Sequence, residues 1–492
     1  MKKETTITLI SCVFFIISSL FFINNDFWQD EIYTLTHFVF TPFTTTLFDY
    51  HVANNHIVFN FLLNVLRRVV GINEVQEILN HPYYFRILPF TISVLNLFVI
   101  YVTSKQLYHK KFALIATSVF ATTFTVINFS VQLRGYSLNI LVCTLLMYYF
   151  LKMIRMQQFQ FKNFMLLLML SACSIFVLPT NVYLVLALCV LIMLFFINPY
   201  LQKYFLENEL KRLELIKLIV SLLLGAAIAT AFYVWLLSIQ YSKEMALPVQ
   251  HFSLKNLVQA LAVWYHFVHF NFHFYVLLAV FVFLIFIKRE KFSDSNILLL
   301  TAVYVLCFII FFLHGVVIIQ RIFLSLIPVY VLFMATLIYD LNERKVFKNF
   351  LPIMLSLNVL AVAISFAVAN TTAELNNKNE VHTQDLINSY YQFYFNPKDA
   401  VIQAQQLAQE KNTTIYVQEG FGGSGIALYL NVFKIPFQYF DLKGKALPNS
   451  FIIVSNIKNK TEQWLDENEF LYEKKMDNKF HFNVYYCYKK KL

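Results

Sequence analysis

Seven ionisable side chains lie at the edges of long apolar stretches of this sequence. Two are acids after the first stretch, two are histidines further along the same loop, and three are arginines that each open a later stretch: Asp30, Glu31, His51, His56, Arg86, Arg134 and Arg321. Ionisable groups beside a bilayer core are costly, so each is by default a functional candidate. Each also has an ordinary interpretation, because arginines snorkel to headgroups, acids cap helices and histidines occur in loops.

Taken together, the acids and arginines fit chemistry in which a phosphate leaves. A carboxylate such as that of Asp30 can accept the proton of an attacking hydroxyl. Arginine forks bind phosphate oxygens through paired hydrogen bonds and stabilise the charge that builds up as the phosphate departs. Such a set on one face of a membrane protein indicates transfer of a group from a phosphate carrier.

The elements that must position these residues are membrane helices. The chain has 492 residues, of which 59% are hydrophobic and only 14% charged, and its mean hydropathy is +0.60. Soluble domains carry about 25% charged residues, so this composition indicates a bilayer as the solvent. The net charge of +11 does not indicate nucleic acid, because the cations lie in short loops between apolar runs. Five of the six cysteines lie inside such runs, so no disulfide framework or zinc motif is expected.

Eleven apolar segments predict an all-α polytopic bundle of about eleven transmembrane helices. They are residues 7–23, 87–103, 112–129, 136–151, 164–178, 182–197, 218–239, 274–287, 297–313, 322–339 and 350–368. Several are shorter than the roughly 20 residues that a straight span needs. A re-entrant hairpin around Pro179 therefore stays open as an alternative to two spans.

The distribution of charge predicts the orientation of the bundle. With the amino terminus inside, every inner loop is rich in Lys or Arg, whereas the outer loops hold few cations for their length. The first segment follows Met-Lys-Lys like a signal peptide, but no small-residue cleavage site follows it, so an uncleaved anchor is expected. The bias toward Phe, Ile, Asn and Lys suggests an AT-rich bacterial genome. We expect a bacterial plasma-membrane protein with the ionisable set facing outward.

The first outer loop, residues 24–86, carries two predicted surface helices. From Asn55 on, apolar residues recur at helical spacing with asparagines and arginines between them. This pattern predicts an amphipathic helix on the membrane surface, with Asn54 or Asn55 as its N-cap. A shorter helix is expected over 31–40.

The chain is predicted to divide into a membrane domain, 1–369, and a polar outer domain, 370–492. In the tail, a helix is expected over 399–410 and strands over 413–417, 451–455 and 480–486, which together predict a small extracytoplasmic α/β domain. Gly420, Gly422, Gly423 and Gly425 form a turn of a kind that can bind anions. Their spacing matches no phosphate-binding motif, so a simple turn is expected.

Three motifs of the first third of the chain resemble those of the GT-C superfamily of membrane glycosyltransferases. This superfamily includes protein O-mannosyltransferases, the lipid A aminoarabinose transferase and rhizobial lipopolysaccharide sugar transferases. FWQDEIY at 27–33 resembles the Asp-Glu motif of the first outer loop, and NHI at 55–57 resembles a His-Pro-Pro-Leu stretch before the surface helix. YFRILP at 84–89 is similar to the Arg-Leu-Pro that opens the second span.

Two further motifs follow in the same order as in the family. QLRGYS at 132–137 is similar to a Gln-x-Ala-Arg-x-Tyr element, and Gln320-Arg321 with Pro328 resembles a late Arg-Tyr and proline element. Two departures are that the prolines after His56 are missing and that Ile322 replaces the usual aromatic residue. The resemblance covers roughly residues 7–339.

The resemblance implies a GT-C-like fold and a glycosyltransferase that takes a monosaccharide from a polyprenyl-phosphate donor. Asp30 would be the general base that activates the acceptor hydroxyl, and Glu31 a neighbour that orients it or the acceptor. The acceptor would be a glycolipid, a polysaccharide or a protein, and the product would be inverted at the anomeric carbon. No nucleic acid takes part.

The remaining site residues implied by the resemblance bind the substrates. The donor phosphate would contact Arg86, Arg134 and Arg321, and the substrates would also contact His56 and Tyr136. No organic cofactor is implied. Because some family members bind a divalent metal with outer-loop carboxylates and histidine, a metal on Asp30, Glu31 and His56 stays open.

Two other functions remain alternatives. A transporter or flippase of lipid-linked sugars would explain many spans with charges, but such proteins usually show repeated halves, which this sequence does not show. A polysaccharide ligase or polymerase would be favoured by the late outer loop 240–273, which holds Trp264, His266, His269 and His273. Aromatic residues there also fit an interface belt.

Overall fold

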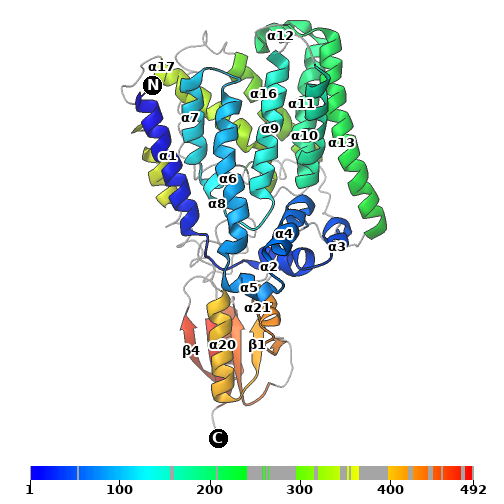
Figure 1. Ribbon diagram of the computed structural model, residues 1–492. Coiled ribbons are helices and arrows are strands. Elements are labelled where there is room, and N and C mark those ends of the chain that lie inside the picture. Colours follow the sequence, from blue (N-terminus) through cyan, green and yellow to red (C-terminus); the bar gives the residue numbers. More distant parts are fainter. Residues whose placement is uncertain are drawn as a thin grey trace. The chain divides into compact units, whose positions relative to one another are not determined.

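The computed structural model describes residues 2–51, 55–155, 160–206, 209–240, 258, 261, 264, 295–314, 320–343, 352–353, 356–364, 397–418, 425–440, 447–455, 458–477 and 483–489. The chain forms two compact units (Figure 1). The first contains Met1–Phe21, Leu47–Leu62 and Ile87–Ala363, and the second contains Phe22–Thr46, Leu63–Arg86 and Ile364–Leu492. Each unit therefore combines segments that are far apart in the sequence.

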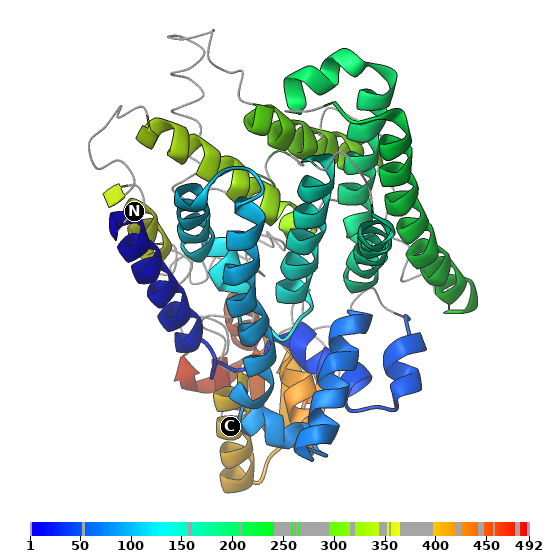
Figure 2. The ribbon, with the colours of Figure 1, turned by 45° about the horizontal axis from the view of Figure 1, so that its top comes forward.

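The first unit is a bundle of apolar helices (Figures 1 and 2). Its elements are α1 Lys2–Phe21, α6 Tyr83–Ser104 from residue 87 on, α7 Lys110–Ala121, α8 Phe124–Phe129, α9 Tyr136–Arg155, α10 Phe161–Val177, the 3-10 turn η2 Pro179–Asn181, α11 Val182–Ile197, α12 Pro199–Phe205, α13 Arg212–Gln240, α16 Ser295–His314, the 3-10 helix η5 Gln320–Leu326 and α17 Ile327–Glu343. Helix α1 packs on α7, α10 lies against α9 and α13, and α16 lies against α11 and α17.

Six helices among the described residues are long and apolar enough to cross a membrane, so we treat the chain as an integral membrane protein. They are Lys3–Phe21, Tyr83–Ser104, Tyr136–Arg155, Pro179–Ile197, Arg212–Ile239 and Ser295–Leu313. Each coincides with a predicted apolar segment, and α11 has the predicted bounds Val182–Ile197. Two shorter apolar helices, Phe161–Val177 and Phe323–Tyr339, coincide with two more.

The remaining predicted segments either differ from the helices of the structure or lie outside the described residues. Segment 112–129 is not one helix, because α7 ends at Ala121 and α8 begins at Phe124. The hydroxyls of Thr122 and Thr123 donate to the carbonyls of residues 118 and 119, and Thr123 takes an extended backbone conformation before α8. Segment 274–287 lies outside the described residues, and only 352–353 and 356–364 of the last segment are described, as helix. The count of about eleven spans stays a prediction.

Close packing of α10 on α13 depends on a glycine. A Cβ placed on Gly225 would lie only 2.3 Å from the carbonyl oxygen of Leu168 and 2.9 Å from the Cβ of Ser171. The Ser171 hydroxyl donates to the Leu222 carbonyl at 2.8 Å across the same contact. Small residues let helix backbones approach in this way inside membranes, where dispersion and hydrogen bonds hold helices together.

The predicted amphipathic helix is α4, Ile57–Val70. Its first backbone bond runs from Asn60 N–H to the His56 carbonyl, so the helix starts after His56 and the expected N-cap at Asn55 is wrong by one position. Asn54 lies outside the described residues. Asn60 and Asn64 are buried, whereas Leu62, Val69 and Val70 are exposed.

The second unit holds short helices of the first outer loop. They are α2 Gln29–Thr34, the π-helix η1 Leu35–Val39 and α5 Val75–Asn80, and α3 Phe43–Phe48 begins there. The expected helix over 31–40 is therefore confirmed as α2 followed by η1. Asn64 of α4 donates to the Thr46 hydroxyl at 2.6 Å and to the Thr41 carbonyl at 3.0 Å, which ties α4 to this loop.

The rest of the second unit is a five-stranded sheet with helices, here called the C-terminal sheet (residues 397–489). Its elements are α20 Pro397–Lys411, β1 Ile415–Gln418, α21 Ile426–Val432, β2 Phe437–Tyr439, β3 Ser450–Ser455, α22 Lys458–Glu467, β4 Phe470–Asp477 and β5 Asn483–Lys489. The strand order is β2-β1-β3-β5-β4, with parallel pairing from β2 to β3 and antiparallel pairing from β3 to β4.

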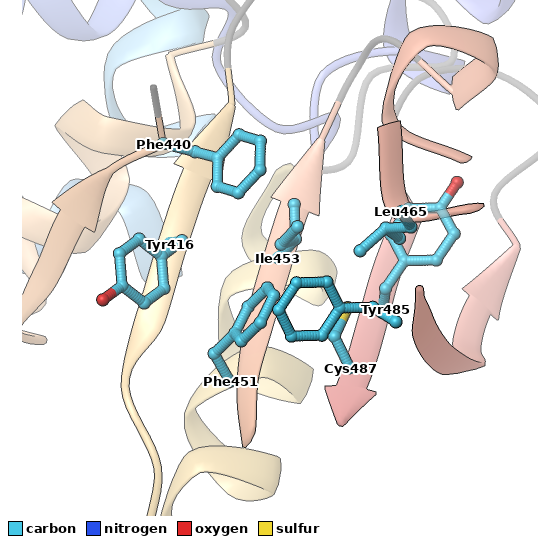
Figure 3. Packing of buried hydrophobic residues seen from close by; sticks show 8 residues of the cluster. Tyr416, Phe440, Phe451, Ile453, Leu465, Tyr485 and Cys487 are labelled. Carbon is cyan, nitrogen blue, oxygen red and sulfur yellow. The ribbon is translucent and has the colours of Figure 1, made fainter. Parts of the chain in front are cut away.

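One face of this sheet carries an aromatic core (Figure 3). The buried members include Tyr416, Phe440, Phe451, Ile453, Leu465, Tyr485 and Cys487. Alternate residues of a strand share a face, which places Phe451 and Ile453 of β3 beside Tyr485 and Cys487 of β5. The predicted combination of strands and helices in the tail is thus present. Helix α20 covers the expected helix, and β1, β3 and β5 overlap the three expected strands, of which residues 480–482 lie outside the described residues. Of the glycine-rich turn only Gly425 is described, with φ +75° directly before α21.

Candidate functional site

The predicted acids lie in a segment of the second unit that we call the Asp30 segment (residues 22–34). Helix α2 begins at Gln29, so Asp30 and Glu31 fall in its first turn, where carboxylates interact favourably with the helix dipole. The Glu31 carboxylate turns back and accepts from the Trp28 N–H at 3.1 Å, which caps the helix. Asp30 is partly exposed, whereas Glu31 is fully buried. The two adjacent acids therefore have different environments.

Glu31 forms a buried ion pair with Arg86. Oε2 of Glu31 lies 2.9 Å from Nη2 of Arg86, and both side chains are almost fully removed from solvent. Arg86 also donates to the Phe22 carbonyl at 2.9 Å and the Asp26 carbonyl at 3.1 Å, and its guanidinium lies 4.8 Å from the centre of the Phe27 ring. Arg86 thus holds both ends of the loop that leads into α2. Its predicted contact with a donor phosphate stays a prediction.

Asp26 is a further acid of this segment, outside the predicted set. Its Oδ2 accepts from the backbone N–H of Lys398, in the first turn of α20, at 2.9 Å. Burial raises the pKa of the Asp26 carboxyl to about 6, against the opposing effect of that hydrogen bond. Only its position four residues before Asp30 could have drawn attention to it.

Tyr429 of α21 is a second residue that the sequence did not indicate. Its hydroxyl accepts from the Phe27 N–H at 2.8 Å and donates to the Phe27 carbonyl at 2.9 Å. The side chain is among the largest that are fully buried in the chain. The C-terminal sheet therefore contacts the Asp30 segment within the second unit.

The first unit brings together three other predicted residues. The ring of His56 packs edge-on against Tyr136, with ring centres 5.1 Å apart, and the guanidinium of Arg134 lies 5.6 Å from the Tyr136 ring. All three side chains are buried. A Cβ on Gly135 would lie 3.0 Å from His56 Nδ1, so the absence of a side chain at 135 admits the imidazole. Residues from distant parts of the sequence thus form one cluster at the start of α9.

His51, from the same stretch as His56, has an acidic partner. Its Nδ1 lies 2.5 Å from Oδ1 of Asp49, and Asn55 donates to the Asp49 carbonyl at 2.6 Å. Both side chains of the pair are partly exposed. His51 belongs to the predicted set, whereas Asp49, which lies away from the first apolar segment, does not.

Some predicted residues are not described in the structure. Arg321 lies in η5, but its side chain is outside the described residues. The same holds for His266, His269 and His273 of the ligase alternative, while Trp264 donates to the Tyr304 hydroxyl. Across the described ranges, no three His, Cys, Asp or Glu side chains are grouped as a metal site. A metal on Asp30, Glu31 and His56 stays an open alternative.

Comparison with known proteins finds similarity only among solved structures. No family model matches the sequence, and no curated protein matches it. The apo structure of ArnT from Cupriavidus metallidurans matches with a TM-score of 0.49 and 11% identity over 98% of this chain and 97% of that one. The structure of the same protein bound to undecaprenyl phosphate matches with a TM-score of 0.49 and 10% identity, again over 98% of this chain and 97% of that one.

A second kind of protein is also found. The oligosaccharyltransferase of Archaeoglobus fulgidus, tethered to an acceptor peptide, gives a TM-score of 0.42 and 12% identity over 87% of this chain and 63% of that one. Because both TM-scores are low, the assignment of a reaction to this chain depends on its own residues.

Proposed function

We propose that this protein is a glycosyltransferase that moves a monosaccharide from a polyprenyl-phosphate carrier to an acceptor hydroxyl at the outer face of a bacterial plasma membrane. The observation that carries the proposal is the environment of Asp30. It is a partly exposed carboxylate next to a buried carboxylate that Arg86 neutralises, on a segment that directly follows the first apolar helix.

The proposed reaction is one displacement at the anomeric carbon. The acceptor oxygen forms a bond to that carbon while the bond from the carbon to the phosphate oxygen breaks, and the electron pair stays on the departing polyprenyl phosphate. Asp30 takes the proton of the acceptor hydroxyl. Attack from the side opposite the phosphate inverts the anomeric configuration.

The arginines have the complementary task of stabilising the departing phosphate. Arg134, buried against Tyr136, is suited to a phosphate because desolvation strengthens its hydrogen bonds to an anion. Arg321 is proposed to contact the same group, as the motif resemblance implies. Both Nη groups of Arg86 are already engaged by the Asp30 segment, so we propose that its first task is to hold Glu31.

His56 and Tyr136 are proposed to bind the substrates. Their edge-to-face contact fixes the orientation of both rings, so a sugar or a phosphate would meet rings that are already positioned. That these residues and Asp30 serve one reaction stays a prediction from the sequence.

Transfer itself can be measured directly. Purified protein in lipid nanodiscs is incubated with a panel of polyprenyl-phosphate monosaccharides and with envelope acceptors, and products are followed by mass spectrometry. We expect transfer from at least one donor, with an inverted anomeric centre by NMR. Translocation of the lipid-linked sugar without transfer would contradict the proposal and support the transporter.

The outward orientation has a separate test in intact cells. An Asp30→Cys variant is treated with a membrane-impermeant maleimide, with Lys110→Cys on the predicted inner side as the matched control. Labelling of position 30 alone is expected, and labelling of position 110 alone would reverse the orientation.

A further inference from the structure

Phe27 lies in a non-helical stretch and depends on another part of the chain for its backbone hydrogen bonds. Its N–H and its carbonyl both bond to the Tyr429 hydroxyl, at 2.8 and 2.9 Å. Buried backbone groups without partners are costly, so a single hydroxyl that serves both fixes this peptide strongly. The Phe27 side chain is fully buried as well.

Phe27 is the last residue before the N-cap of the helix that carries the acids. Trp28 is that N-cap, with φ −83° and ψ 171°. Asp30 follows within the first turn of α2. Since Asp30 is only the second residue of α2, its position depends on how the start of that helix is held.

Two further contacts join the same elements. A Cβ on Gly425, immediately before α21, would lie 3.1 Å from the Cα of Gln29, the first residue of α2. The Asp26 carboxylate accepts from the Lys398 N–H, one of the N–H groups at the start of helix α20 that have no carbonyl partner within the helix. The C-terminal sheet therefore contacts the residues before and at the start of α2 from both α20 and α21.

We propose that Tyr429 is a positioning residue for Asp30, and that the C-terminal sheet thereby sets the geometry of the reacting carboxylate through the double hydrogen bond to Phe27. The inference rests on the proposed function of Asp30. The hydroxyl keeps its proton at all working pH values, because burial raises the pKa of Tyr429 well above its ordinary value. The double hydrogen bond to Phe27 is thus not broken by titration of this hydroxyl.

The test compares Tyr429→Phe with a matched control, Tyr485→Phe. Both tyrosines are fully buried in the second unit, but Tyr485 belongs to the sheet core and its hydroxyl donates to Glu462 at 3.0 Å. The first readout is hydrogen exchange in the full-length protein. The amide of Phe27 is expected to exchange faster in Tyr429→Phe and to stay as in the wild type in Tyr485→Phe.

The second readout is steady-state transfer from the lipid-phosphate donor. We expect kcat to fall about 10- to 100-fold in Tyr429→Phe while KM for the donor stays within about twofold, because misplacing a base affects the chemical step more than binding. Gly425→Ala, which strains a left-handed backbone position and pushes on Gln29, is expected to act in the same direction.

Three results would overturn the inference. One is unchanged Phe27 exchange in Tyr429→Phe. Another is faster exchange with unchanged kcat, and the third is an equal loss of kcat in Tyr485→Phe, which would indicate general instability. A wild-type protein that transfers no sugar from any donor would instead refute the proposed function, and with it the catalytic role of the hydrogen bonds between Tyr429 and Phe27. The exchange result would still decide whether Tyr429 holds the Asp30 segment.

Discussion

Glu31 and Arg86 are 55 residues apart in the sequence and meet in a buried ion pair, Oε2 to Nη2 2.9 Å. The pair joins the start of α2 to the first turn of α6, the helix that the sequence predicts as the second span. Asp30, the adjacent residue, is left partly exposed. One acid of the Asp-Glu motif is thus buried in an ion pair, and the other is partly exposed.

Removing one partner of this pair is expected to be costly. Arg86→Gln leaves the Glu31 charge buried and should destabilise the protein by about 3–5 kcal/mol, and Glu31→Gln in the same background should recover part of that loss. Chemical unfolding of the single and double variants measures the coupling between them. Additive effects would contradict a direct ion pair.

Asp26→Asn is expected to stabilise the protein, and more at high pH than at low pH. The pKa of Asp26 is raised from 3.8 to about 6, so the folded protein holds this proton more tightly than the unfolded chain. The stability that the protonated Asp26 carboxyl contributes is fully present below pH 3.8 and is lost as the pH rises through 6.

An amide at position 26 keeps an oxygen acceptor for Lys398 N–H and carries no charge to desolvate. Since one pKa unit corresponds to about 1.4 kcal/mol, the gain at pH 8 is at most about 3 kcal/mol, and less because the side chain is partly exposed. Melting temperatures of wild type and variant at pH 5 and pH 8 check this. A variant that is less stable than wild type at pH 8 would refute it.

Gly225→Val is expected to loosen the contact between α10 and α13. The new side chain would overlap the Leu168 carbonyl oxygen, which already lies 2.3 Å from an ideal Cβ, so the helices must separate at a cost of about 1–3 kcal/mol. Ala227→Val, on an exposed position of the same helix, is the control. Thermal unfolding in the same detergent compares the two, and equal melting temperatures would argue against the close approach.

Gly135→Ala is expected to weaken substrate binding. The added methyl group would lie 3.0 Å from His56 Nδ1 and displace the imidazole from Tyr136. We expect KM for the lipid donor to rise about tenfold, which corresponds to roughly 1.4 kcal/mol. In a His56→Ala background the same substitution should add little, and an undiminished further loss there would rule out an effect through His56.

The helices of the bundle could be predicted from the sequence, because a long apolar run is stable in a membrane as a helix. A backbone without water must bond within its own helix, so the run 182–197 predicted α11 residue for residue. The break at Thr122 was missed, since apolar counting takes no account of hydroxyls that bond their own backbone.

The contacts that fix the Asp30 segment could not be predicted from the sequence in the same way. Tyr429 and Phe27 are separated by 402 residues, and no spacing in the sequence relates them. The asparagines of α4 mislead for a related reason. Asn60 and Asn64 resemble a water-facing stripe, but both are buried, and their amides bond Asn55 and Thr46. Tertiary partners decide where a polar side chain lies.

Single-turnover transfer with Asp30→Asn, beside Asp466→Asn, measures whether Asp30 takes the proton of the acceptor hydroxyl. Asp466 is an exposed acid of α22 in the C-terminal sheet and serves as the matched control. We expect Asp30→Asn to bind the lipid donor as the wild type does but to transfer sugar at least about 100-fold more slowly, while Asp466→Asn transfers normally. Wild-type transfer rates in Asp30→Asn would contradict it.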